Sequence, residues 1–579
     1  MTGQQSTIEP GRRSRGPRQV DEARWRGLLY GLTALTALIY TYLAFFEPGT
    51  LTYAPFTIQD DARQFLAWMS RLGDPAAMQG DLIADYWQSV CPPFYRAIYS
   101  AAAAIGLTPT LFARVLPLAL LAFSAWMAWR VAIMMTKRPL AAFVAAAFVV
   151  SFILHEDSIY SATPRAFSTP LFLLFLDGLL RNRGWTMIPA LFVLGLLYPS
   201  TAIVGVTMIG LSRIGWRPFR IDFSLRSWLL GGLAAAAVLL AMLPLADSAD
   251  RWEPTLTVSQ ALSMPNLGTP EGRSTIVGLS GRVDYLCSAR MGVLPEIVPC
   301  WSTRWAVLPN LLLMVPMLLL AWGALRRTHY QPDEGPGDLI YAWTLIAGIA
   351  WFAAALAVAF SLHLPSRFTQ RTLSILEFLA IGQMLGLLLD RWASEGRRRG
   401  LSIVGALTAG FLLASFATPL PGFNRPSDEQ AITRIGATPE GTVIGGVSDQ
   451  LDFVPALTGR SALATIEHSI PYHTRYFGPL QQRLEASLAA VSTPDPAVLA
   501  DYVRRYRVNL LAVDPALVER GELPERYASV VPQAVASARA ALARQPSALQ
   551  QRASACTVHR GRLLLLDGAC LASGSRRPI

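Results

Sequence analysis

The stretch KRPLAAFVAAAFVVSFILHED, from Lys137 to Asp157, decides what kind of fold this chain can have. Its central part, 139–154, is apolar except for one serine, with two basic residues before it and two acidic residues soon after it. A helix of roughly 20 mostly apolar residues crosses the hydrocarbon of a bilayer. Basic residues collect at the cytoplasmic ends of such helices. The stretch therefore predicts a membrane helix that runs outward from the cytoplasm.

Similar apolar runs recur before residue 420, at 28–46, 111–135, 166–180, 228–246, 305–325, 339–362, 371–390 and 401–419. A further stretch, 186–212, carries Pro199 near its middle and basic residues at both ends, which favours a hairpin of two short helices. These runs predict a polytopic α-helical membrane domain over 28–419 with about 11 membrane helices.

The composition points to the same class of protein. The chain has 579 residues, 52% hydrophobic and only 15% charged, and its mean hydropathy is +0.36. Soluble proteins carry about 25% charged residues and disordered chains carry more, so both classes are excluded. The formal net charge of +11 would suit nucleic acid. We expect no such partner, because the arginines cluster beside apolar runs, where membrane topology places them.

The arginine clusters also predict the orientation of the chain. If the N terminus is cytoplasmic, the clusters between spans fall on the cytoplasmic side. We expect the basic segment 1–27 to be disordered and the first span to stay uncleaved. The outer segments are then 47–110, 155–165, 247–304, 363–370 and 420–579. The predicted location is a bacterial inner membrane, with the sites of interest on its outer face.

The last segment, 420–579, has a different character from the rest. Charged residues return, and short β-type runs alternate with helical patterns, which predicts an extracytoplasmic α/β domain. The cysteines form two neighbouring pairs and one single residue, namely Cys287 with Cys300, Cys556 with Cys570, and Cys91. In an oxidising compartment each pair can form a disulfide, and free thiols fit the sequence equally well.

The first outer loop contains the acidic pair Asp60 and Asp61. Apolar residues follow at helical spacing and predict an amphipathic helix at the membrane surface; they are Ala62, Phe65, Leu66, Met69 and Leu72. Asp61 and Gln64 have the spacing of a helix capping box, so a structural role is favoured for Asp61. Adjacent carboxylates resist joint ionisation, which raises the pKa of one of them. We therefore expect Asp60 to be a proton acceptor, with Asp61 also in the catalytic set.

The second outer loop carries His155, Glu156, Asp157 and Arg165. Acids at the C-terminal end of a helix oppose its dipole, so they do not stabilise that helix. One interpretation is a solvated short loop. The other is that Glu156 and Asp157 are catalytic and face Asp60 across a cavity. There they would orient an acceptor hydroxyl or, together with Asp60, hold a divalent cation, Mg²⁺ or Mn²⁺, through carboxylate oxygens. His155 and Arg165 would then contribute to substrate binding.

The third outer turn carries His363, Arg367 and Arg371 just before an apolar run. Arginines on this face depart from the usual charge bias, and a guanidinium pairs well with phosphate. We expect this turn to bind a lipid phosphate; the alternative is that the arginines reach the interface as ordinary flanking residues. Glu377 lies inside the following span, where a carboxylate is a candidate site unless an arginine pairs with it.

These groups suit transfer of a sugar from a lipid phosphate. The phosphate leaves as an anion that arginines stabilise, so departure needs no general acid. A carboxylate takes the proton of the acceptor while attack occurs from the opposite face, which inverts the anomeric carbon.

The order of these motifs resembles the GT-C superfamily of polyprenyl-phosphate-sugar-dependent glycosyltransferases, which includes protein O-mannosyltransferases and the aminoarabinose transferase of lipid A. The likeness covers about 28–420 and rests on Asp60 and Asp61, the second acidic loop, and the sequence LPSRFTQR at 364–371. It implies that Asp60 is the catalytic base. Those relatives often carry Asp-Glu where this chain has Asp-Asp, and no Trp-Trp-Asp motif of an oligosaccharyltransferase occurs.

The sequence thus predicts an inverting glycosyltransferase. Its partners would be a polyprenyl-phosphate sugar, an extracytoplasmic glycan, lipid or protein acceptor, and membrane lipids. A transporter or flippase of lipid-linked saccharides is the alternative, although such proteins usually show internal repeats and midplane charges. A scaffold that recruits other proteins through its tail is a third possibility.

Overall fold

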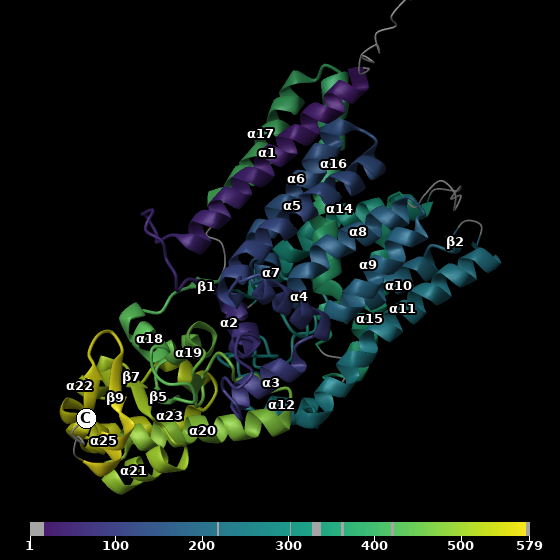
Figure 1. Ribbon diagram of the computed structural model, residues 1–579. Coiled ribbons are helices and arrows are strands. Elements are labelled where there is room, and N and C mark those ends of the chain that lie inside the picture. Colours follow the sequence, from purple (N-terminus) through teal and green to yellow (C-terminus); the bar gives the residue numbers. More distant parts are fainter. Residues whose placement is uncertain are drawn as a thin grey trace, which may run out of the picture.

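The computed structural model describes residues 17–216, 219–300, 303–326, 337–360, 364–417 and 422–574. These residues form a bundle of long apolar helices with a smaller domain at one end (Figure 1). The bundle helices are α1 (Pro17–Phe45), α5 (Pro109–Thr136), α6 (Pro139–His155), α8 (Ser168–Leu180), α9 (Gly184–Leu197), α10 (Pro199–Leu211), α11 (Leu225–Ala249), α14 (Val307–Arg326), α15 (Leu339–Ala357), α16 (Arg367–Ser394) and α17 (Arg398–Ala417).

Six helices in the described ranges are long and apolar enough to cross a bilayer. Four shorter apolar helices accompany them, in α6, α9, α10 and α17. A polytopic helical membrane protein with a C-terminal domain is therefore confirmed. The total of about 11 membrane helices and the domain boundaries remain predictions.

Helix α6 packs closely against α16 because both helices carry small residues at their contact. A Cβ atom on Gly382 would lie 2.6 Å from the Cα of Ala145, and one on Gly386 would lie 2.6 Å from the Cα of Ala141. Small residues let membrane helices approach through their backbones. The pairing is antiparallel, so the first turn of α16 lies next to the C-terminal end of α6.

The predicted helical hairpin is present as α9 and α10. Tyr198 alone separates the two helices, and Pro199 begins α10, where its missing N–H costs no hydrogen bond. Gly205 leaves room for the side chain of Leu191 on the facing helix. The turn of this hairpin therefore brings Tyr198 to one end of the bundle.

The first outer loop does not form the amphipathic surface helix that its pattern predicted. It forms a short helix, α2 (Asp60–Leu66), then a 3-10 turn, α3 (Leu82–Val90) and α4 (Pro93–Ala104). Ala62, Leu66 and Met69 are buried in one core with side chains of the C-terminal domain. The apolar face thus meets protein where membrane contact was expected, because periodicity does not distinguish these two surroundings.

The C-terminal domain contains a five-stranded sheet in the order β6–β5–β7–β9–β8. The strands are β5 (Val443–Val447), β6 (Ser461–Ala462), β7 (Leu510–Val513), β8 (Thr557–His559) and β9 (Leu564–Asp567). Strand β5 is parallel to β6 and β7, and β9 is antiparallel to β7 and β8. Helices pack around the sheet (Figure 1), chiefly α18 (Glu429–Gly436), α20 (Thr474–Ser492), α21 (Pro496–Arg505), α23 (Pro532–Arg544), α24 (Ala548–Cys556) and α25 (Gly568–Ser573).

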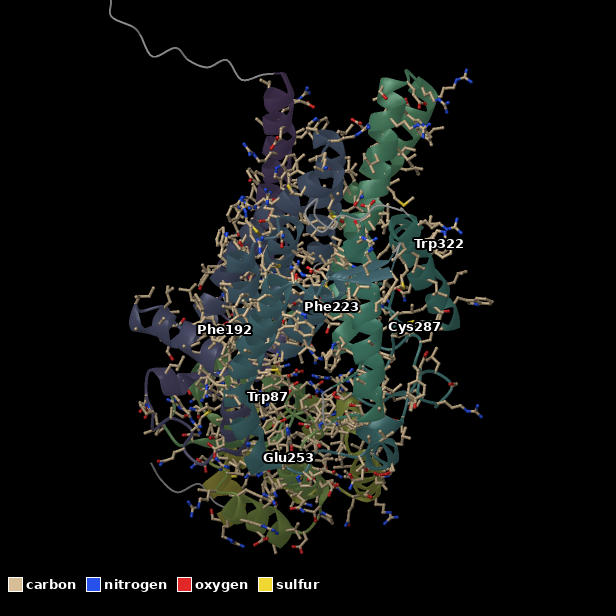
Figure 2. The ribbon with its side chains drawn as sticks, turned by 90° about the vertical axis from the view of Figure 1, so that its right-hand side faces the viewer. Trp87, Phe192, Phe223, Glu253, Cys287 and Trp322 are labelled. Carbon is tan, nitrogen blue, oxygen red and sulfur yellow. A yellow bond between two sulfur atoms is a disulfide. The ribbon has the colours of Figure 1, made fainter. Side chains whose placement is uncertain are left out.

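The C-terminal domain packs against the loops at one end of the bundle. Strand β1 (Ile58–Gln59) pairs with β4 (Phe423–Asn424), which joins the first outer loop to the start of the tail. The ring of Tyr86 stacks on Tyr476 at a centroid distance of 3.6 Å. Figure 2 shows Trp87 and Glu253 near this domain, at the same end of the molecule. The loops 47–110 and 247–304 and the tail therefore lie together at one end of the bundle.

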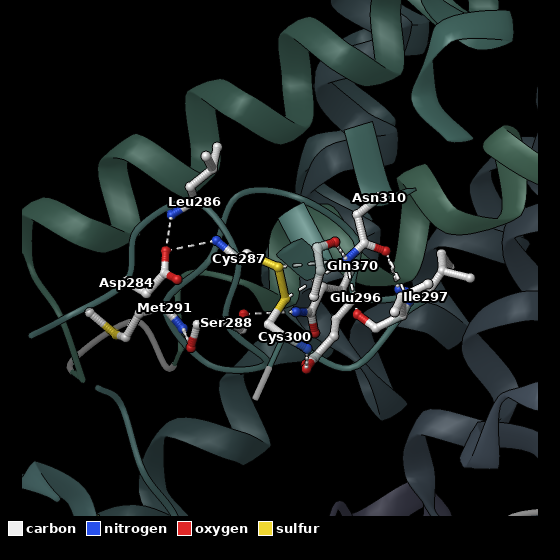
Figure 3. Close-up of a disulfide and its surroundings, with 12 residues drawn as sticks. Asp284, Leu286, Cys287, Ser288, Met291, Glu296, Ile297, Cys300, Asn310 and Gln370 are labelled. Carbon is white, nitrogen blue, oxygen red and sulfur yellow. Dashed lines mark hydrogen bonds between the residues drawn. A yellow bond between two sulfur atoms is a disulfide. The ribbon is translucent and has the colours of Figure 1, made fainter. Parts of the chain in front are cut away.

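Both neighbouring cysteine pairs form disulfides, Cys287–Cys300 and Cys556–Cys570. Figure 3 shows the first of them beside Asn310, whose side chain donates to the carbonyl of Val298 at 2.9 Å. Nearby, Gln370 of α16 donates to the carbonyl of Ser288 at 3.1 Å. The disulfide-closed loop is thereby attached to the first turns of α16.

Removal of the second disulfide by Cys556→Ser with Cys570→Ser should lower the free energy of unfolding of the C-terminal domain by about 3 kcal/mol, because the cross-link limits the unfolded chain. Pulse proteolysis of the full-length protein in urea measures this. Reductant should lower the stability of the C-terminal domain equally in the wild type and not further in the variant, which keeps only the Cys287–Cys300 disulfide outside this domain. The free cysteine, Cys91, should not interfere with this measurement, because burial raises the pKa of its thiol and so keeps it out of disulfide exchange. Equal urea midpoints for variant and wild type would contradict the prediction.

Candidate active site

Three separate outer segments meet at the end of the bundle that carries the C-terminal domain. Arg165 lies between α6 and α8 and binds Asp157 with 2.7 Å between Nη2 and Oδ2. The same guanidinium pairs with Asp61 of α2. At the start of α16, Arg371 pairs with Glu156. The loop 47–110, the loop 155–165 and the start of α16 therefore each contribute charge to one place.

Neutral side chains complete these contacts. Arg371 donates to the hydroxyl of Ser158, which in turn donates to Oε1 of Glu156 at 2.6 Å. Arg367 donates to the hydroxyl of Tyr198 at 2.9 Å and lies over its ring. We call the six charged residues of this site the arginine–carboxylate cluster: Asp61, Glu156, Asp157, Arg165, Arg367 and Arg371.

The cluster contains three arginines and three carboxylates, so its formal charge is balanced. Arg371 is only 14% exposed. Burial acts to lower the pKa of Arg165, but Asp157 and Asp61 outweigh it and raise that pKa. The pKa of Asp157 is raised by burial against the opposing effect of Arg165. Removing charged groups from water costs free energy that their mutual attraction only partly returns. A cluster of this kind adds little to stability, which makes it a candidate for function.

Neither alternative interpretation of these loops fits the arrangement. Glu156 and Asp157 are not merely solvated, because each binds an arginine. Arg367 and Arg371 do not reach outward as flanking residues, because they bind Tyr198 and Glu156.

The two acids of the first loop have different partners. Asp60 pairs with Arg63 and accepts a hydrogen bond from Asn424 at 3.2 Å, whereas Asp61 belongs to the cluster. The Asp60 side chain is 46% exposed. Burial and the charge of Glu467 raise the pKa of Asp60 above its ordinary value, although Arg63 lowers it. Asp60 is thus the more accessible carboxylate and has a raised proton affinity.

The capping role predicted for Asp61 is wrong. The side chain of Gln59 caps α2 by accepting from the backbone N–H of Ala62 at 3.2 Å. Gln64, the expected partner of Asp61, donates to Glu467 instead. The pattern failed because a residue of the C-terminal domain competes for Gln64.

The remaining predicted residues have other positions. His155 is the last residue of α6, and His363 lies outside the described residues. Glu377 is fully buried in α16, and no described residue forms a hydrogen bond with its carboxylate. The arginine considered as its partner, Arg371, binds Glu156.

A divalent cation does not fit the predicted ligands in this arrangement. Among the described residues, no group of three or more His, Cys, Asp or Glu side chains is placed to hold a metal ion. Asp60, Glu156 and Asp157 each bind an arginine. One oxygen of each carboxylate is thus already paired with positive charge.

Sequence reasoning missed Tyr198, Arg63 and Glu467. A tyrosine directly before the proline of the predicted hairpin was a usable signal for Tyr198. Arg63 follows the acidic pair by one helical turn, which was a signal for an ion pair. Glu467 had no local signal.

Solved structures with the same architecture were found, whereas comparisons of the sequence found none. No family model matches the sequence, and no curated protein matches it. The Archaeoglobus fulgidus oligosaccharyltransferase tethered with an acceptor peptide matches 92% of this chain and 72% of its own, with 11% identity and a TM-score of 0.50. AglB of the same organism, in complex with an inhibitory peptide and a dolichol-phosphate, matches 85% and 70%, with 10% identity and a TM-score of 0.49.

ArnT from Cupriavidus metallidurans, bound to undecaprenyl phosphate, matches 94% of this chain and 99% of its own, with 14% identity and a TM-score of 0.45. At such low identity these likenesses show the fold alone. Of the three structures, the tethered oligosaccharyltransferase has the highest TM-score, and the comparison of folds rests on it. The chain therefore shares its overall fold with this oligosaccharyltransferase, in agreement with the resemblance that the order of its motifs predicted.

Proposed function

We propose that this protein is an inverting glycosyltransferase that moves a sugar from a polyprenyl phosphate to an acceptor outside the cytoplasm. The observation that carries the proposal is the meeting of three outer segments in the arginine–carboxylate cluster, with Asp60 beside it.

The arginines supply the site for the leaving phosphate. Arg165, Arg367 and Arg371 have guanidinium groups suited to bidentate contact with phosphate oxygens. When the donor binds, its phosphate replaces part of the contacts that the arginines make with carboxylates. The positive charge then stabilises the departing polyprenyl phosphate, so no proton donor is needed for the leaving group. The dolichol-phosphate and undecaprenyl phosphate bound to the fold relatives are of this chemical class.

Asp60 acts as the base in this mechanism. Its half-exposed carboxylate, with its raised pKa, is suited to accept the proton of an acceptor hydroxyl. Asp61 holds Arg165 in place through their ion pair. Attack on the anomeric carbon from the face opposite the phosphate breaks the sugar–phosphate bond and inverts the configuration.

Lipid-linked sugars report on this function directly. In cells that lack the protein, we expect one polyprenyl-phosphate sugar to accumulate several-fold, measured by mass spectrometry of extracted lipids. The purified protein in vesicles should then consume that lipid and release polyprenyl phosphate in the presence of an acceptor extract. A flippase would move the lipid between leaflets without consuming it. An unchanged lipid pool in the deletion strain would count against the proposal.

A further inference from the structure

The carboxylate of Glu467 connects three distant parts of the chain. It is 2% exposed and lies in the C-terminal domain, after β6. Its Oε1 lies 2.8 Å from Nη2 of Arg273, in the outer loop 247–304. Its Oε2 lies 3.3 Å from Nη2 of Arg63 in α2 and 3.5 Å from Nη2 of Arg526 in its own domain. Three guanidinium groups thus converge on one buried carboxylate.

Charge balance makes this carboxylate necessary. Arg526 also binds Asp452 at 2.8 Å, and the backbone N–H of Glu467 donates to Asp452 at 2.9 Å. Burial acts to raise the pKa of Glu467, but Arg273, Arg63 and a hydrogen bond from Gln64 lower it to about 2. Glu467 is therefore ionised at any physiological pH. Without it, Arg273 would lose its carboxylate partner, while Arg63 would keep Asp60 and Arg526 would keep Asp452.

Arg63 is shared between Glu467 and Asp60. Its Nη2 contacts both carboxylates, and its side chain is 5% exposed. Its guanidinium also lies over the ring of Phe453, with 4.7 Å to the centroid. The next residue, Gln64, donates to Glu467 at 2.5 Å. Two consecutive residues of α2 therefore bind one carboxylate of the C-terminal domain.

We propose that Glu467 is a positioning residue of the transfer reaction: by sharing Arg63 with Asp60 and binding Gln64, it lets the docked C-terminal domain set the place of Asp60. This inference rests on the proposed function. If Glu467 is neutral, Arg63 is free to pair with Asp60 alone, which ties up the carboxylate that receives the proton. The arginine–carboxylate cluster is built from other residues, so donor binding does not depend on Glu467.

The test compares Glu467→Gln with wild type in the full-length protein, with the donor lipid identified from the deletion strain. We expect kcat to fall about 10- to 100-fold while KM for the donor stays within about twofold. Glu467→Asp keeps the charge and should recover a clear part of kcat. The control is Glu522→Gln, which removes an exposed ion pair with Arg520 in the same domain and should leave kcat unchanged.

A double-mutant cycle separates positioning from simple stabilisation. Arg63→Gln should lower kcat by itself, and adding Glu467→Gln should lower it by less than about twofold more, because both changes break one connection. A purely structural role predicts a loss of folded protein, normal kcat per folded molecule and additive effects of the two changes on stability. This result would overturn the inference.

If Glu467→Gln does not fold, Gln64→Met tests the same connection. It should lower kcat a few-fold with donor KM unchanged, and an unaltered kcat would also overturn the inference.

Different results would overturn the proposed function and the role of Glu467. A wild-type protein that consumes no polyprenyl-phosphate sugar overturns the proposed function and, with it, this inference. An active wild type with a fully active, folded Glu467→Gln variant overturns the inference alone.

Discussion

Asp60→Asn is expected to slow sugar transfer about 10³-fold while the protein stays folded. The amide retains the shape of the side chain and can still accept the hydrogen bond from Asn424, but it has no useful affinity for a proton. The measurement is kcat of the purified variant with donor lipid in vesicles, with its folded fraction checked by thermal unfolding. Transfer at the wild-type rate would remove Asp60 from the mechanism.

Asp61→Asn is the matched control because it changes the neighbouring carboxylate. Asp61 binds Arg165, so we expect mainly a higher donor KM and a smaller loss of kcat. The opposite result, an active Asp60→Asn and an inactive Asp61→Asn, would make Asp61 the base. The pH profile adds a check on the wild type. Since burial and Glu467 raise the pKa of Asp60 above 3.8, activity should be lost as pH falls through a value higher than 3.8.

Arg367→Ala is expected to raise the donor KM about 10- to 100-fold, because a charged hydrogen bond to phosphate contributes about 1.5–3 kcal/mol. Its hydrogen-bond partner is the hydroxyl of Tyr198, so the variant breaks no ion pair among the described residues. Binding of the purified protein to polyprenyl phosphate measures the effect apart from catalysis. A control is Arg138→Gln, which breaks an ion pair with Asp390 at the other end of the bundle. Equal affinity of Arg367→Ala and wild type would contradict the phosphate assignment.

Arg371→Ala should weaken donor binding similarly, but it should also destabilise the protein because Glu156 is left buried without its arginine. The double variant Arg371→Ala with Glu156→Gln should recover stability without recovering affinity for polyprenyl phosphate. This pair of variants separates the contribution of Arg371 to the ligand from its contribution to folding. Recovery of affinity in the double variant would show that Arg371 acts only by pairing with Glu156.

Much of the candidate site was predictable because its charges stand at the ends of apolar runs. Arg165, Arg367 and Arg371 depart from the usual distribution of basic residues, and that departure is visible in the sequence alone. The structure places them with Asp61, Glu156 and Asp157. Their catalytic and binding roles remain predictions that the variants above test.

The wrong predictions for the first loop, and the missed residues Arg63 and Glu467, depend on the C-terminal domain. The pattern of Ala62, Leu66 and Met69 is correct for an amphipathic helix, but the apolar face of that helix meets this domain rather than lipid. Gln64 binds Glu467 and not the start of its own helix. In each case a residue distant in the sequence competes with a local partner.

The sequence by itself determined the class of protein, the positions of the apolar helices and the end of the bundle at which the site lies. These properties follow from hydropathy and charge, which are local and additive along the chain. Only the tertiary structure decided that Asp60 and Asp61 turn to different partners and that the cysteines pair as they do. Adjacent residues share the same local pattern, so their separate partners are set by packing between segments hundreds of residues apart.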